Sequence, residues 1–259
     1  MILPLILLLG AVQPIQEIGH AIKMFNGTSN RQQIYYHTDA AQSIGKIPVD
    51  VTELGVDYLT IVGHKFYAPR IGALYVRDLG GVTGCPLKPL FLGGGQERGY
   101  RAGTENVAMI SGLGKACQLV TLNLRLYQNH MQTMRDKLEA VLEQKFSNIH
   151  FNAKTDKSTR LPNTCNFSLI GPGLYGRRIL DNCQQVVAGV GAACHSSGDV
   201  CQGSQVLLAS GIPNDIACNA IRLSVGRDTS EGDITQAVDD LYQAFISVSK
   251  IRKIPHHKD

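Results

Sequence analysis

The fold is decided by residues 37–77, HTDAAQSIGKIPVDVTELGVDYLTIVGHKFYAPRIGALYVR. Two apolar, strand-like runs in this stretch each end close to a charged group, Asp39 after the first run and Lys65 after the second. A lysine amine forms a Schiff base with the aldehyde of pyridoxal phosphate (PLP), and a carboxylate keeps the pyridine nitrogen of PLP protonated. The two residues together predict PLP-dependent chemistry on an amino acid.

The composition is that of an ordinary globular protein. The chain has 259 residues, of which 44% are hydrophobic and 18% are charged, enough for one large domain or two smaller ones. The formal net charge of +4 is too small to indicate a nucleic-acid partner. The seven cysteines are an odd number without metal-ligand spacing, so we expect reduced thiols in the cytosol and no metal site.

The N-terminal run MILPLILLLGAVQP carries no charge. It is too short to cross a bilayer as a helix, and it lacks the basic residue and cleavage site of a signal peptide. We therefore expect no membrane partner. Residues 1–13 are interpreted either as a buried strand or, preferably, as an aberrant apolar start created by truncation.

Strand and helix patterns alternate along the chain, which predicts an α/β fold with a mixed, mostly parallel sheet. Strands are expected at residues 33–37, 57–62, 71–76, 163–169, 185–190 and 220–225. Helices are expected at residues 14–25, 49–54, 104–126, 128–146, 174–183 and 230–250, the last capped by Ser230. We predict a PLP-binding domain over residues 1–118 and a C-terminal domain over residues 119–259.

Four motifs occur in the order found in one enzyme group: residues 37–77, GGGQERGYRAGTEN (93–106), VGAACHS (190–196) and NAIRLSVGR (219–227). Together they resemble the class V, fold-type I PLP enzymes, which include cysteine desulfurases and selenocysteine lyases. The resemblance covers residues 14–250. It implies the fold-type I (aminotransferase class V) transferase fold, with a partial large domain and a smaller C-terminal α/β domain.

Within this group, three features favour the selenocysteine lyases. Ala193 and His195 flank Cys194, whereas mitochondrial-type desulfurases look more like GSACTS. Val62 stands before Gly-His-Lys, where desulfurases typically place Ser, and RLPNTCNFSLIGP (160–172) points the same way. The implied reaction converts L-selenocysteine to L-alanine and reduced selenium. The alternatives are a cysteine desulfurase that supplies persulfide sulfur and an inactive fragment that serves only as an interaction module.

The resemblance also implies roles for single residues. Lys65 would be the Schiff-base lysine and would take the α-proton, and Cys194 would act on the selenium or sulfur of the substrate. Arg222 would clamp the substrate carboxylate. The remaining cofactor contacts would be Asp39 at the pyridine nitrogen, Gln42 at the phenolate oxygen, His64 at the phosphate, and Thr104 at the phosphate of the neighbouring subunit of a homodimer.

Taken singly, these residues have simpler interpretations. Asp39 would be a helix cap, Lys65 and Arg222 surface charges, and Cys194 a small core thiol. Their occurrence in one set of ordered motifs favours the chemical interpretation.

Family members have a longer N-terminal part, with a Gly/Thr phosphate loop and a histidine that stacks on the pyridine ring, and neither is found in this sequence. We therefore expect weak PLP binding, uncovered apolar surface, and an apolar run 5–12 without a partner.

Overall fold

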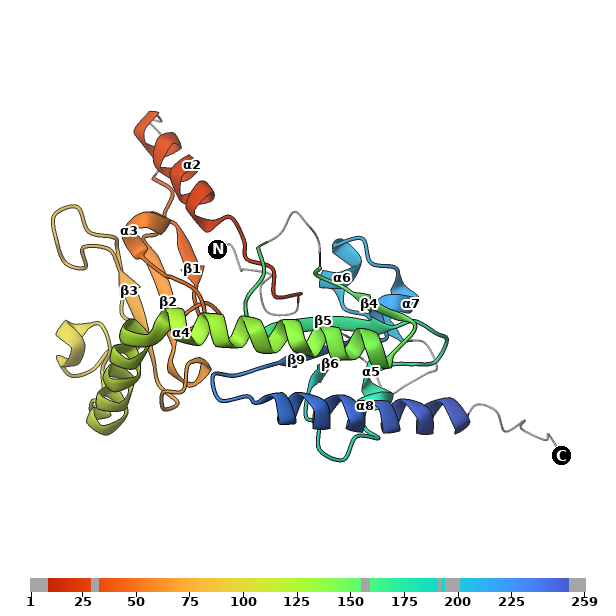
Figure 1. The fold of residues 1–259 in the computed structure, drawn as a ribbon. Coiled ribbons are helices and arrows are strands. Elements are labelled where there is room, and N and C mark those ends of the chain that lie inside the picture. The colour runs from red at the N-terminus through yellow and green to blue at the C-terminus, as the bar shows by residue number, and fades with distance from the viewer. Residues whose placement is uncertain (1–8, 29–32, 155–158, 191, 194–200, 252–259) are drawn as a thin grey trace. The chain divides into compact units, whose positions relative to one another are not determined.

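The structure, a computed structural model, describes residues 9–28, 33–154, 159–190, 192–193 and 201–251. The chain divides into two compact units, each with its own sheet (Figure 1). The described part of unit 1 lies within residues 13–126, and that of unit 2 comprises residues 9–12 together with residues from 127 onward. The division thus falls between Leu126 and Tyr127, whereas the sequence places it after residue 118.

Unit 1 carries the stretch 37–77 on a three-stranded sheet with the order β1-β2-β3. Its elements are α2 (Ile15–Thr28), β1 (His37–Asp39), α3 (Val51–Leu54), β2 (Tyr58–Val62), the 3-10 helix η1 (Gly63–Lys65), β3 (Gly72–Val76), the 3-10 helix η2 (Gln96–Gly99) and the first part of α4 (Val107–Lys145). Ile15 of α2 and Leu59 of β2 are buried in the core beside Tyr36 and Val56.

The strand pairing of unit 1 is mixed. β1 and β2 are parallel, with Asp39 opposite Thr60, because the connection between them is long enough to cross over through α3. β2 and β3 are antiparallel, with Val62 opposite Gly72, because the short segment between them can only turn the chain back. The expected mixed sheet is therefore present in unit 1, with one parallel and one antiparallel pair, although parallel pairs do not predominate among the described strands.

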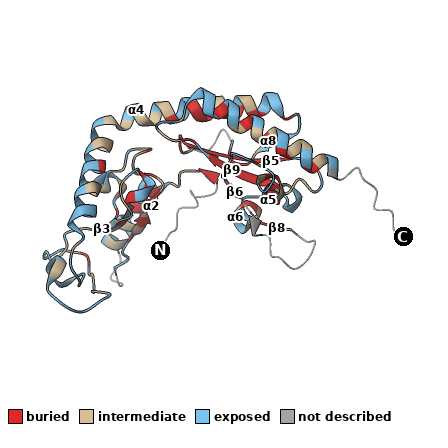
Figure 2. Cartoon of the chain, turned by 90° about the horizontal axis from the view of Figure 1, so that it is seen from below, coloured by how far each residue is buried: buried red, intermediate tan, exposed pale blue. Residues whose placement is uncertain are grey.

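Unit 2 contains a four-stranded sheet with the order β4-β5-β9-β6, and all of its pairs are antiparallel. Its elements are β4 (Ile149–Phe151), β5 (Thr164–Leu169), α5 (Gly176–Leu180), β6 (Gly189–Val190), β7 (Ala192–Ala193), β8 (Gln202–Gly203), α6 (Gln205–Ala209), α7 (Asn214–Ala217), β9 (Ala220–Ser224) and α8 (Glu231–Ile251). Every residue of β5 is buried, as Figure 2 shows. The predicted strand at 163–169 is therefore confirmed as a central strand.

Two helices bury one face each in the core of unit 2. On α4 the buried residues recur at helical spacing: Met131, Met134, Leu138 and Leu142. On α8 they are Ile234, Val238, Leu241, Ala244 and Val248. The predicted cap of α8 is confirmed, because Ser230 Oγ accepts a hydrogen bond from the Asp233 N–H at 3.2 Å, and Asp233 Oδ2 accepts one from the Ser230 N–H at 2.8 Å.

The two helices expected at 104–126 and 128–146 are one continuous helix of 39 residues, α4. No glycine or proline lies between Cys117 and Lys145, so nothing in the sequence stops the helix at Tyr127.

The first part of α4 exposes large apolar side chains, namely Val107, Met109, Ile110, Leu122 and Leu126. The predicted uncovered apolar surface is therefore confirmed. Among the described helices, α4 meets the length and composition of a membrane span, a weak criterion that core helices of soluble proteins also meet.

The described end of the N-terminal apolar run pairs within unit 2. The Val12 N–H donates to Thr159 O at 2.8 Å, and Gly10 O accepts from the Leu161 N–H at 2.7 Å. Leu9 is buried in a small apolar cluster with Leu207 and other residues. The expectation that the run 5–12 lacks a partner is wrong for residues 9–12.

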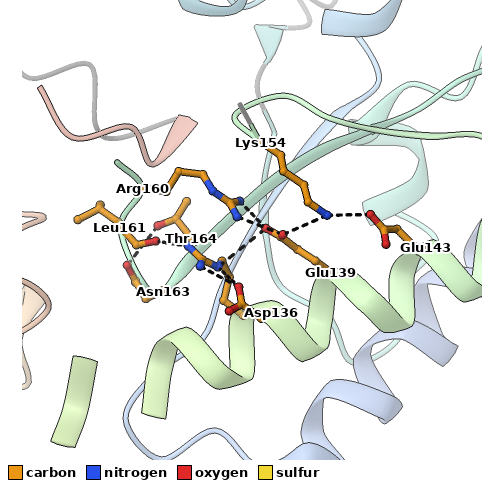
Figure 3. A network of polar contacts seen from close by, with 9 residues as sticks. Asp136, Glu139, Glu143, Lys154, Arg160, Leu161, Asn163 and Thr164 are labelled. Atoms are coloured by element: carbon orange, nitrogen blue, oxygen red, sulfur yellow. Dashed lines mark hydrogen bonds and ion pairs between the residues drawn. The ribbon is translucent and has the colours of Figure 1, made fainter. Parts of the chain in front are cut away.

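A buried carboxylate joins α4 to the segment that pairs with residues 10–12. Glu139 is 4% exposed and forms an ion pair with Arg160 Nη1 at 2.6 Å (Figure 3). Lys154 Nζ lies 3.9 Å from the same carboxylate, and Arg135 Nε lies 4.0 Å from it. Arg135 also donates from Nη1 to the backbone carbonyl of Leu161 at 2.9 Å. These contacts attach the segment around Arg160 to the helix.

We expect Asp240→Ala to lower the free energy of unfolding of unit 2 by about 1.5–3 kcal/mol. The Asp240 carboxylate accepts hydrogen bonds from the backbone N–H groups of Gln184, Gln185 and Val186. Burial acts to raise the pKa of Asp240, but the N–H donors outweigh it, so the pKa lies below its ordinary value. The contribution is therefore present above about pH 4 and is lost as pH falls through the lowered pKa.

The measurement for Asp240 is urea unfolding between about pH 7 and pH 3. Asp239→Ala is the matched control, because the Asp239 carboxylate is 56% exposed and, among the described residues, pairs only with the exposed Lys145, at 2.8 Å. Such a surface pair contributes about 0–1 kcal/mol. Equal losses of stability in the two variants at neutral pH would contradict the prediction.

Candidate functional site

The carboxyl ends of β1 and β2 bring two of the predicted site residues to one edge of the unit 1 sheet. The Ala40 N–H, just after β1, donates to Thr60 O at 3.0 Å, and His37 Nε2 lies 2.9 Å from Thr60 Oγ1. Asp39 is the last residue of β1, and Lys65 lies in η1 directly after β2. Because neighbouring parallel strands end at the same edge, ligands bind where such ends meet.

Asp39 is held by its own turn and keeps one oxygen available. It is half-buried, and its Oδ1 accepts a hydrogen bond from the Ala41 N–H at 2.8 Å. Its Oδ2 has no hydrogen-bond partner within the described residues. Gln42 lies half-buried in the turn that follows. A fixed carboxylate with a free oxygen suits the protonated nitrogen of a pyridine ring.

Gly63 determines the course of the backbone that carries His64 and Lys65. Its N–H donates to Ile71 O at 2.8 Å, and a Cβ at this position would lie 2.6 Å from the same oxygen. Only glycine allows this close approach. His64 and Lys65 are exposed, and the Lys65 amine has no hydrogen bond or ion pair with any described residue. The amine is therefore available to an aldehyde.

Lys46 is a residue of this site that the sequence analysis did not select. It is 7% exposed, and its Nζ donates to the backbone carbonyl of Lys65 at 3.2 Å. Burial, together with the nearby charge of Lys65, lowers the pKa of Lys46 to about 8. The available signal was its position in an apolar stretch, between Ile44-Gly45 and Ile47-Pro48, where a solvated lysine is unusual.

Asp57 is a structural carboxylate of unit 1. Its Oδ2 accepts from the Tyr36 N–H at 2.8 Å, and its Oδ1 accepts from Arg77 Nε at 2.8 Å and from the Cys85 thiol at 3.4 Å. Burial and this carboxylate raise the pKa of Cys85 to about 11. Asp57 therefore joins the start of β1 to the end of β3 and has no free oxygen for a ligand.

Thr104 lies in the exposed loop between η2 and α4. Arg101 Nη1 donates to Gly103 O at 3.0 Å and to Thr104 O at 3.3 Å. No described hydrogen bond joins Thr104 to Asp39 or Lys65. Its contact with the phosphate of a neighbouring subunit stays a prediction.

The two predicted substrate residues belong to unit 2. Arg222 is half-buried in β9, opposite Asn166 on β5 and Gly189 on β6. A Cβ at Gly189 would lie 3.1 Å from Nη2 of Arg222, so this glycine provides the space for the guanidinium group. Cys194 lies outside the described residues, and its role stays a prediction.

The comparisons with known proteins agree on one family. The model of the aminotransferase class-V family matches residues 6–236. The chain is 54% identical to selenocysteine lyase of Homo sapiens, over 91% of this chain and 53% of that protein. It is 53% identical to selenocysteine lyase of Rattus norvegicus, over 91% of this chain and 55% of that protein. Cysteine desulfurase IscS of Clostridium botulinum is 38% identical, over 90% of this chain and 55% of that protein.

Solved structures share the fold. A NifS-like protein superposes with a TM-score of 0.76 at 29% identity, over 92% of this chain and 58% of the other. A second one, from Rickettsia africae, superposes with a TM-score of 0.73 at 27% identity, over 93% and 59% of the two chains. The chain spans about half the length of the curated relatives that it matches.

Proposed function

We propose that this chain, which belongs to the aminotransferase class-V family, carries out PLP-dependent selenocysteine lyase chemistry. In this reaction L-selenocysteine, with two electrons from a thiol reductant, yields L-alanine and selenide, a reduced selenium species. The observation that carries the proposal is the 54% identity to a selenocysteine lyase over 91% of the chain. The desulfurase relatives support the runner-up function less well, at 38% identity over a similar span.

The relatives in this family are PLP-dependent, and the residues of unit 1 fit this cofactor. Asp39 would hold the proton of the pyridine nitrogen through its free oxygen, and Gln42 would bond the phenolate oxygen. His64, with Thr104 of a second copy, would donate hydrogen bonds to the phosphate. When bound, PLP withdraws electrons from the α-carbon of the amino acid. The exposed amine of Lys65 would hold the cofactor and then carry the α-proton.

Two residues of unit 2 would act on the amino acid itself. Arg222 would bind the substrate carboxylate, because a guanidinium group matches two carboxylate oxygens in a fixed geometry. Cys194 would assist the departure of selenium, since a thiol can act as an acid or a nucleophile.

A homodimer in the cytosol is part of the proposal. The exposed apolar side chains on the first part of α4, among them Ile110 and Leu122, support association with a second copy. The later part of the same helix buries Met131, Leu138 and Leu142 in a protein core.

We expect Cys194→Ala to abolish selenium release without loss of PLP binding. The assay follows alanine and selenide release from L-selenocysteine, with L-cysteine as the competing substrate. The protein is a fusion in which the N-terminal half of rat selenocysteine lyase precedes residue 14. Cys117→Ala, which changes an exposed cysteine of α4, is the control. A Cys194→Ala variant that cannot hold PLP would show that Cys194 is structural. Preferential turnover of L-cysteine by the unmodified fusion would favour the desulfurase function.

A further inference from the structure

The buried side chain of Lys46 contacts the backbone of the segment that carries Lys65. Lys46 is in the turn that follows β1, and its Nζ donates to the Lys65 carbonyl at 3.2 Å. No ion pair joins Lys46 to a carboxylate within the described residues. The Lys65 carbonyl is the hydrogen-bond acceptor that the Lys46 ammonium group has among them. A buried ammonium group with one acceptor is costly to desolvate, and an apolar side chain would fill the same space at lower cost. The sequence retains a cation at this point nonetheless.

The segment that Lys46 contacts is anchored at its start, where the Gly63 N–H donates to Ile71 O at 2.8 Å. The backbone hydrogen bonds within the segment are short-range: the Phe66 N–H donates to Gly63 O at 3.0 Å, and the Ala68 N–H donates to the same oxygen at 3.1 Å. His64 and Lys65 are exposed, and Tyr67 adopts a left-handed backbone with φ 67°. Lys65 is the last residue of the 3-10 helix, and no backbone N–H of the described residues donates to its carbonyl.

The turn that holds Lys46 is itself fitted against this segment. Gly45 has φ +79°, and a Cβ at this position would lie 2.9 Å from Cβ of Phe66. Phe66 is buried, so the backbone of residues 45–46 and the residue after Lys65 are in close contact. The Lys46 side chain therefore reaches the Lys65 carbonyl from a backbone that is held in place by packing against Phe66.

We propose that Lys46 is a positioning residue that fixes the Lys65 backbone and so directs the Lys65 amine toward the cofactor. The proposal rests on the proposed role of Lys65 as the residue that holds PLP. Lys46 would act through Lys65 and would not itself contact the cofactor. A purely structural lysine would stabilise unit 1 as a whole, whereas a positioning lysine restrains residues 63–68 in particular.

Hydrogen–deuterium exchange of the cofactor-free 259-residue chain tests the proposal without any activity measurement. Three variants are compared with the unmodified chain: Lys46→Met, which removes the donor and the charge, Lys46→Arg, which keeps both, and Lys88→Met, which changes an exposed lysine of the same unit. In Lys46→Met, exchange in a peptide covering 63–68 should become about tenfold faster, the effect of losing one hydrogen bond from a charged donor. β3 should keep its protection, and Lys46→Arg should restore most of the protection of residues 63–68.

A second readout uses PLP at saturating concentration. Borohydride trapping of PLP on Lys65 should be about tenfold slower in Lys46→Met than in Lys88→Met, and Lys46→Arg should recover it. Unchanged exchange at 63–68 in Lys46→Met would overturn the proposal. Faster exchange throughout unit 1, or no rescue by arginine, would overturn it in favour of a structural role. If the unmodified chain traps no PLP on Lys65, the proposed function fails, and the exchange result still decides whether Lys46 restrains this segment.

Discussion

Lys65→Ala is expected to abolish covalent trapping of PLP on the chain and, in the fusion with a restored N-terminal half, to remove alanine release. Lys65 is exposed at the edge where β1 and β2 end, and its amine has no partner among the described residues. The same amine would move the α-proton, a task that contributes about 10²–10⁴-fold to a rate. Loss of both roles makes this the largest functional effect that we predict.

The measurement is borohydride reduction at saturating PLP, followed by peptide mapping. In the unmodified chain the label should be found on Lys65. Lys88→Ala, a change of an exposed lysine, is the control and should trap PLP normally. Lys46 is the informative competitor, because its lowered pKa of about 8 leaves more of its amine unprotonated, while its burial keeps an aldehyde away. A label on Lys46 or Lys88 in place of Lys65 would contradict the assignment.

Glu139→Ala is expected to destabilise unit 2 by about 3–5 kcal/mol, the range for removing one partner of a buried ion pair. Glu139 is almost wholly buried, and its carboxylate faces Arg160, Arg135 and Lys154. The Arg160 side chain is only 16% exposed and would lose the carboxylate with which it pairs, whereas Arg135 would keep its ion pair with Asp136 at 2.8 Å. The segment that pairs with residues 10–12 would lose its attachment to α4.

Urea unfolding at neutral pH measures this loss. Glu143→Ala is the matched control one helical turn further along α4. Its carboxylate is 49% exposed and, within the part of the chain that the structure describes, bonds only Lys154, at 2.9 Å, so its removal should cost about 0–1 kcal/mol. Similar losses in the two variants would mean that burial does not set the contribution of Glu139. A Glu139→Gln variant, which keeps the volume, should still be clearly less stable than the unmodified chain.

Short-range features of the sequence were sufficient to predict much of the fold and of the candidate site. The charged groups after two strand-like runs predicted the edge at which Asp39 and Lys65 lie, and the apolar spacing with Ser230 predicted α8 and its cap. The ordered motifs identified the fold class, which the NifS-like structures confirm. These features are encoded within a few residues, because periodicity, caps and strand ends depend on neighbours along the chain.

Other features depend on which distant segments pack together, and only the tertiary structure decided them. β3 returns antiparallel to β2, α4 continues past Tyr127 in one piece, and residues 10–12 pair with residues 159–161. Glu139 looks like an ordinary surface charge in the sequence, because helical position alone does not reveal burial. The apolar neighbours of Lys46 hint at burial, but they do not show which group its ammonium contacts. Their environment arises only when a second segment, around Lys65 or around Arg160, closes over them.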